Sequence, residues 1–172
     1  MGWEALRRLR GGPGARDVLD RLGITAPAVD SFAIAEKLGV RLIPTTDPHP
    51  NWVVALDSNP PESTTESAAT ATIWYRPDSN RRAQQFAVAH ALGHLLLHPP
   101  GVYRDLGDFQ GGQAEQEVNQ FAAGLLMPRH LLLAEILRGY NTIAQLAEIF
   151  EVSPKAMDLR VQNMGLVHYL RG

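Results

Sequence analysis

The chain has 172 residues, of which 45% are hydrophobic and 20% charged, which is ordinary for a globular protein with one real core. The formal net charge is −2, so we expect no bulk electrostatic attraction to nucleic acid or to an anionic membrane. The absence of cysteine excludes a disulfide framework and any cysteine-based metal site or nucleophile. The first residues contain no long apolar run, so we expect no signal peptide or membrane span, and a cytoplasmic location.

The front half of the chain predicts a small sheet with helices. The breaker cluster RGGPG at 10–14 indicates that the residues before it form a frayed helix or an arm. Helices are then expected at 15–22 and 32–38, the second capped by Asp30 or Ser31. Strands are expected at 40–43, 52–56 and 71–75, with 57–70 as a long hairpin loop.

The back half is helical in pattern. After a cap at Ser79 or Asn80, helices are expected at 81–98, 113–127, 128–139, from Asn141 or Thr142 onward, and from Ser153-Pro154 to Gly165, with a loop up to Gly112. This order predicts an α+β fold with a small N-terminal sheet and a helical C-terminal module. We expect one domain over 1–172, with a core at about 1–139 and the module at about 140–172.

The stretch that carries most chemistry is His90-Ala91-Leu92-Gly93-His94. Two histidines four residues apart lie on one face of a helix, where both imidazoles reach one metal ion. In zinc peptidases of the His-Glu-x-x-His type, the residue after the first histidine is a glutamate that takes a proton from water at the metal. Here that residue is Ala91, whose methyl group accepts no proton. The pattern therefore predicts a metallopeptidase scaffold with an intact metal site and no general base.

A hydrolytic zinc site usually has three protein ligands, so a third is needed beside His90 and His94. The next helix offers Glu115 and Glu117, which lie about 200° apart on a wheel of 3.6 residues per turn. Because Glu115 shares a stripe with Asn119 and Ala122, we predict Glu115 as the ligand. Asn119, one turn on, is expected to hydrogen-bond a ligand histidine.

The same histidine pair also fits a half-buried pair without a metal. The apolar flanks favour a metal site, since buried imidazoles need partners. Gly93 costs a helix about 1 kcal/mol against alanine, which indicates a need for close approach. We interpret His98, beside two prolines, as a capping or surface residue. His130 and His168 could stabilise an oxyanion. Tyr75, Tyr103 and Tyr140 are further possible hydrogen-bond donors, although they fit core or surface aromatics better. The sequence gives no geometry for any of these residues.

Two segments, RRAQQFAVAHALGHLLLH and EQEVNQFAAGLLMP, resemble the ImmA/IrrE family of metallopeptidases. The matching positions of the first are Phe86, His90, Leu92, Gly93, His94 and His98. Those of the second are Glu115, Phe121, Ala122, Leu125, Leu126 and Pro128. The resemblance covers about half of the chain well. It implies zinc, or alternatively manganese, bound by His90, His94 and Glu115. It also implies cleavage of a helix-turn-helix repressor of the Xre kind, which switches on stress or mobile-element genes.

The chain departs from the family pattern at two positions. Val118 replaces an alanine, a small change in packing, and Ala91 replaces the catalytic glutamate, which implies an inactive chain. Either Ala91 is an introduced substitution in an active peptidase or the chain is a natural non-catalytic relative. We favour the first interpretation, because a natural chain that no longer needs catalysis would be expected to have changed at its metal ligands as well.

The sequence of residues 142–166 resembles a helix-turn-helix, which suggests DNA binding as an alternative function. However, 141–172 contains three basic residues (Lys155, Arg160, Arg171) and three acidic ones (Glu148, Glu151, Asp158). A net charge of zero is poor for phosphate contact. We therefore interpret this segment as a module for packing or for holding a protein substrate, and we expect no direct nucleic-acid binding. A non-catalytic module that binds a repressor or senses metal is the second alternative. The oligomeric state stays unknown.

Overall fold

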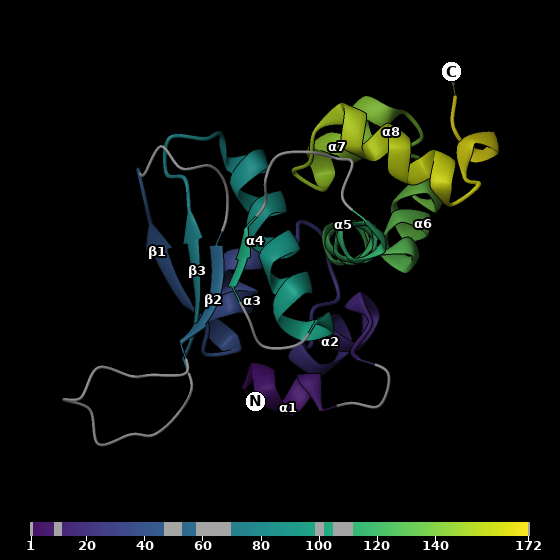
Figure 1. Cartoon of the computed structure of the whole chain (residues 1–172). Helices are drawn as coiled ribbons and strands as arrows, with labels where there is room; N and C mark the ends of the chain where they lie inside the picture. The colour runs from purple at the N-terminus through teal and green to yellow at the C-terminus, as the bar shows by residue number, and fades with distance from the viewer. Residues whose placement is uncertain are drawn as a thin grey trace.

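A computed structural model describes residues 2–8, 12–46, 53–57, 70–98, 102–104 and 112–171. Four strands form one mixed sheet in the order β1-β3-β2-β4 (Figure 1): β1 (Arg41–Pro44), β2 (Val53–Asp57), β3 (Thr70–Tyr75) and β4 (Val102–Arg104). Strand β1 runs parallel to β3, whereas β2 is antiparallel to both β3 and β4. The three predicted strands are thus present, and no end differs from its predicted position by more than one residue.

Two expectations concern the segments between these strands. Asp57 pairs with Thr70, so β2 and β3 are the two arms of a hairpin, while the loop between them lies outside the described residues. The expectation of only a loop before Gly112 is wrong, because β4 pairs with β2 there. A strand of three residues is too short for an alternating pattern to show, and its partner lies far away in the sequence.

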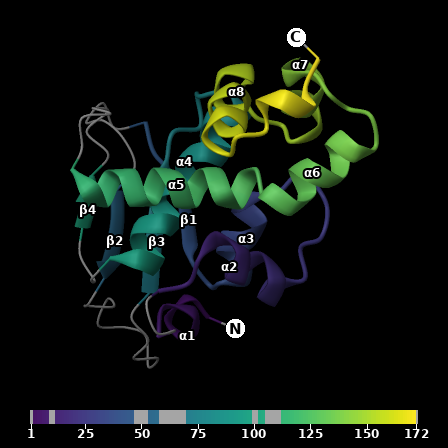
Figure 2. The same cartoon turned by 90° about the vertical axis from the view of Figure 1, so that its right-hand side faces the viewer.

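Helices make up most of the remaining described residues, and the predicted α+β class is confirmed. They are α1 (Trp3–Arg7), α2 (Ala15–Leu22), α3 (Ser31–Lys37), α4 (Arg81–Leu97), α5 (Gln113–Leu126), α6 (Arg129–Leu137), α7 (Ile143–Ile149), α8 (Pro154–Asn163) and the 3₁₀ turn η1 (Val167–Tyr169). Helices α5 and α6 follow each other across one face (Figure 2). Among the described residues, no helix is long and apolar enough to cross a bilayer.

Helix α4 is the centre of the molecule. It contacts α1, α3, β2 and β3 as well as α5, and Figure 1 shows it between the sheet and α5. Gln85 and every residue from 87 to 96 are buried. A helix that is apolar nearly all round is the kind that other elements enclose. The two histidines of the sequence motif therefore lie in the core.

The first residues form a short helix, one of the two forms expected, but this helix is docked on the core and is neither frayed nor a loose arm. Leu6 of α1 is completely buried in the main apolar cluster, and α1 packs against α4. The breaker residues after α1 predicted its end correctly, but docking of a five-residue helix depends on a distant partner that local pattern does not show.

The C-terminal helices begin at the expected caps. Thr142 forms a reciprocal capping box with Gln145, and Ser153 accepts a hydrogen bond from the backbone N–H of Ala156 before Pro154 opens α8. An ion pair of 2.6 Å between Arg82 and Glu148 ties the start of α4 to α7. The boundary near residue 139 between core and module stays a prediction.

Asp30 connects the start of α3 to α4. Its carboxylate accepts hydrogen bonds from the backbone N–H groups of Phe32 and Ala33 and from Gln85, and it pairs with Arg81 at 3.0 Å. Burial acts to raise the pKa of Asp30, but the bonds from Gln85, Ala33 and Phe32 and the charge of Arg81 outweigh it, so the pKa lies below its ordinary value.

We expect Asp30→Ala to lower the free energy of unfolding by about 1–2 kcal/mol, the range for lost N-caps, in urea titration at neutral pH. Because the folded-state pKa is lowered, the contribution is complete above the unfolded pKa near 3.8 and is lost as pH falls through the lower folded value. Asp20→Ala is the control, since it removes only an exposed pair with Arg16 and is expected to change stability by less than about 0.5 kcal/mol. Equal losses in the two variants would contradict the assignment.

Candidate metal centre

The two histidines of α4 point to the same place. The side chains of His90 and His94 are almost completely buried, and their Nε2 atoms lie 3.1 Å apart. Four residues of helix, a little more than one turn, bring the rings together, and their centroids are 4.8 Å apart in an edge-on arrangement. The helix therefore offers two imidazole nitrogens to one point.

Helix α5 adds a carboxylate from its first turn. The Oε2 atom of Glu115 lies 3.3 Å from His90 Nε2, and its Oε1 atom lies 3.2 Å from His94 Nε2. Glu117 points elsewhere, with Oε2 3.7 Å from His98 Nε2. The ligand atoms of His90, His94 and Glu115 all lie within 4.8 Å of one another. The structure thus brings together the three residues that the helical stripe selected, with Glu115 and not Glu117.

Neighbouring side chains fix the orientation of both rings. His90 Nδ1 lies 3.0 Å from the Oδ1 atom of Asn119, an oxygen that only accepts hydrogen bonds, so His90 carries its proton on Nδ1 and keeps a lone pair on Nε2. His94 Nδ1 lies 3.1 Å from His98 Nδ1, which can accept in the same way. Such contacts orient ligand histidines at metal sites.

The interpretation of His98 as a capping or surface residue is wrong for its side chain. The residue does terminate α4, but its ring is only 11% exposed and lies against His94. The helix keeps its regular path to Leu97, so the spacing of four residues carries a third histidine onto the same stripe. The pattern His-x-x-x-His-x-x-x-His contained this signal.

The electrostatics of the site favour a neutral imidazole at His94. Burial, together with the nearby His90 and His98, lowers the pKa of His94 to about 3. At neutral pH His94 is therefore uncharged, the form that binds metal ions.

The donor set fits a metal ion. Two nitrogen lone pairs and a carboxylate converge at 3.1–3.3 Å, an arrangement that is repulsive unless a cation or a proton lies between them. Ligand bonds of about 2.0–2.1 Å in tetrahedral geometry would place the ligand atoms about 3.3 Å apart, close to the separations found here. The mixture of imidazole and carboxylate is typical of zinc in hydrolytic sites, and the metal's identity stays a prediction.

Gly93 sets the distance between the two helices. A Cβ atom at this position would lie 3.0 Å from Val118 Cβ and 3.3 Å from Val118 Cα and Phe121 Cδ1. Contacts this short leave no room for a methyl group unless α5 moves. Gly93 therefore allows the close approach of α4 and α5 that brings Glu115 to the two histidines. The sequence had indicated such an approach, because a glycine destabilises a helix.

Other candidates lie apart from this cluster. Tyr75 packs edge-on against Phe32, His168 stacks on Tyr169, and His130 lines a separate cavity. Tyr140 is exposed, and the side chain of Tyr103 lies outside the described part of the chain. Ala91 is 1% exposed and belongs to the main apolar cluster.

Comparison with known proteins identifies the family. Residues 35–162, most of the chain, match the model of peptidase M78, described as the IrrE N-terminal-like domain. The chain belongs to this family. A search of curated proteins gives no significant match. Family membership implies a metallopeptidase-like scaffold, and the matched range contains both helices of the His90, His94 and Glu115 cluster.

The two glutamates of α5 give a matched test of the metal centre. Glu115→Gln should lower zinc affinity by at least about 100-fold, because it replaces a charged ligand by a weak one. Glu117→Gln removes the same charge two residues away and should change affinity less than about threefold. Competition with a chromophoric chelator measures both, after the parent's stoichiometry is determined. A parent that binds no zinc, or equal losses in the two variants, would disprove the ligand assignment.

A second variant tests the helix contact. We expect Gly93→Ala to destabilise the fold by about 1–2 kcal/mol, since overpacking of about 1–3 kcal/mol exceeds the gain in helix propensity. It should also weaken zinc binding, because α5 carries Glu115 away. Gly112→Ala is the control: it begins the same helix, and a Cβ there meets nothing within 4 Å. A Gly93→Ala protein as stable as the parent would contradict the close-contact argument.

Proposed function

We propose that this chain is a zinc-dependent endopeptidase scaffold directed at a helix-turn-helix repressor, and that Ala91 leaves it catalytically disabled. The observation that supports the proposal best is the convergence of His90, His94 and Glu115 beside an alanine at the position of the family's glutamate. Cleavage of the repressor would derepress stress or mobile-element genes. Manganese is the alternative metal.

Each side chain has a distinct task in this proposal. His90, His94 and Glu115 would hold the metal, while Asn119 and His98 keep the imidazole protons on Nδ1. When bound, the metal would act as a Lewis acid that polarises a carbonyl and makes water more acidic. Residue 91 would then have to accept a proton, and a methyl group cannot. Binding of metal and protein therefore remains, and turnover is lost.

The surface of the C-terminal module suits contact with a protein. Among the residues whose side chains the structure describes, four of the five exposed large hydrophobic ones lie in the module, Tyr140, Leu159, Val167 and Tyr169, and the fifth, Leu137, ends α6 just before it. Exposed apolar side chains are the groups that protein interaction sites use most. This distribution supports the module as the part that holds a repressor.

Restoring the base tests the proposal. We expect Ala91→Glu to restore cleavage of the cognate helix-turn-helix repressor, because general-base catalysis contributes typically about 10²–10⁴-fold. Ala91→Gln is the matched control, because glutamine has the size of glutamate but cannot act as a base. This variant should cleave no more repressor than the parent protein does. Fragments are followed on gels with zinc or manganese present. Both variants should be less stable than the parent, since residue 91 is buried.

The same experiment separates the proposal from a natural binding module. If the Ala91→Glu protein binds metal and repressor but cuts nothing, the chain is a non-catalytic binder and the proposal fails. If Ala91→Gln cuts as fast as Ala91→Glu, residue 91 is not the base.

The DNA-binding alternative makes a different prediction. With no net charge over residues 141–172, we expect no binding of duplex DNA that weakens steeply with added salt. Fluorescence anisotropy at low ionic strength measures this. A strong salt dependence would favour a regulator that uses the C-terminal helices on DNA.

A further inference from the structure

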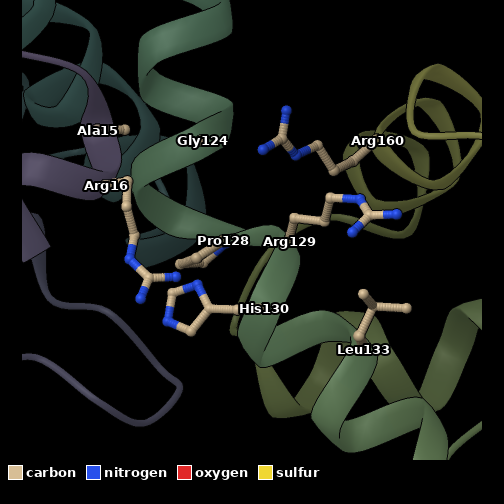
Figure 3. A pocket seen from close by; sticks show the side chains of 8 residues that line it. All are labelled: Ala15, Arg16, Gly124, Pro128, Arg129, His130, Leu133 and Arg160. Atoms are coloured by element: carbon tan, nitrogen blue, oxygen red, sulfur yellow. The ribbon is translucent and has the colours of Figure 1, made fainter.

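A cavity of about 430 Å³ opens where α2, α5, α6 and α8 meet (Figure 3). It lies at the C-terminal end of α5, whereas Glu115 lies in the first turn of that helix. The titratable residues that line it are Arg16, Arg129, His130 and Arg160, and no acidic residue lines it. They come from three helices that are far apart in the sequence. The metallopeptidase proposal uses none of them.

Arg160 is a half-buried cation without an acidic partner in the described part of the chain. Its Nε atom donates a hydrogen bond to the carbonyl oxygen of Met127 at 3.1 Å, which anchors the side chain at the end of α5. Burial lowers its pKa to about 10, so the guanidinium stays charged at neutral pH. Charges withdrawn from water are normally paired, because an isolated one is costly to bury.

Arg129 adds a second uncompensated charge. It is the first residue of α6, and it forms no ion pair within the described ranges. Arg16 differs, because Asp20 holds its Nε atom at 2.8 Å from both carboxylate oxygens. Burial and the charge of Arg16 lower the pKa of His130, which leaves a neutral ring with one N–H donor at neutral pH. The cavity thus has two free guanidinium charges and a neutral donor.

The remaining wall is small or apolar. Gly124 keeps the floor open, since a Cβ there would lie 3.1 Å from Ala15 Cβ and 3.6 Å from a terminal nitrogen of Arg160. Pro128 and Leu133 supply apolar surface beside the cations (Figure 3). The volume lies in the usual range for small-molecule sites.

We propose that this cavity binds a small phosphorylated ligand, with the phosphate on Arg129 and Arg160 and its apolar part against Pro128 and Leu133. Guanidinium forks bind phosphate oxygens in pairs, and a tetrahedral anion presents oxygens to donors from several helices at once. A concave site of this size favours a small ligand over the convex backbone of a duplex. The inference does not depend on the peptidase proposal.

Isothermal titration of the full chain with pyrophosphate and with ATP tests the site. The protein and buffers are first passed over chelating resin, and the titrations are repeated with one equivalent of zinc, so that binding through the metal centre is recognised. Arg129→Gln and Arg160→Gln should each weaken binding at least about tenfold, the loss expected for one charge-assisted contact. Lys155→Gln is the control: it removes one charge from α8 outside the cavity and should change affinity less than about twofold.

The outcomes are distinct. Binding that requires Arg129 and Arg160 but not Lys155, with or without zinc, supports the site. Because Arg129 is exposed, its variant remains informative if loss of the Met127 bond destabilises Arg160→Gln. Absence of binding, equal losses in all three variants, or binding only with zinc would overturn it. Citrate or duplex DNA binding at least as tightly through the same arginines would replace it by a carboxylate or nucleic-acid site.

Discussion

The contact between Gly93 and Val118 is the constraint on which the candidate site depends. The histidines come from α4 and the carboxylate from α5, so the separation of the two helix axes sets the distance between the ligands. Val118 lies three residues after Glu115, and a methyl group at position 93 would meet it at 3.0 Å. A change of a few tenths of an ångström here acts directly on a centre whose ligand atoms are 3.1–3.3 Å apart. The valine that distinguishes this chain from the family pattern makes the glycine more necessary.

Residue spacing in the sequence predicted which side chains share one face of a helix. It did not predict contacts between segments that are far apart in the sequence. The i, i+4 rule placed His90 with His94, and the stripe through Asn119 selected Glu115 over Glu117. Caps at Asn80, Thr142 and Ser153 gave the helix starts. The burial of Leu6 under α4 and the short strand β4 required a partner far away in the sequence. Ser31 shows the same limit: it begins α3, but its hydroxyl donates to Gln85 on α4.

In the proposed function, metal binding and proton transfer depend on different atoms. Three ligand side chains and their two hydrogen-bonding neighbours are arranged without any contribution from residue 91, whose methyl group packs into the apolar cluster. An alanine there satisfies the core better than a carboxylate does, because it needs no hydrogen-bond partner. An alanine at position 91 is therefore neutral or favourable for folding. The fold therefore accepts Ala91 without rearrangement of the candidate ligands.

Helix α5 is held unevenly along its length, and this bears on how a metal would act. Its far end is fixed by Arg160 on the Met127 carbonyl and by Ala15 against Gly124, and its middle by α4 at Gly93. Glu115 lies beyond these contacts in the first turn, where Gly112 supplies no side-chain cap and the carboxylate is 30% exposed. A bound ion would therefore supply the missing restraint, joining the first turn of α5 to the buried histidines of α4. Metal binding free energy is then partly free energy of folding for this end of the helix. With a metal bound, the centre would act as a structural clamp whether or not residue 91 can accept a proton.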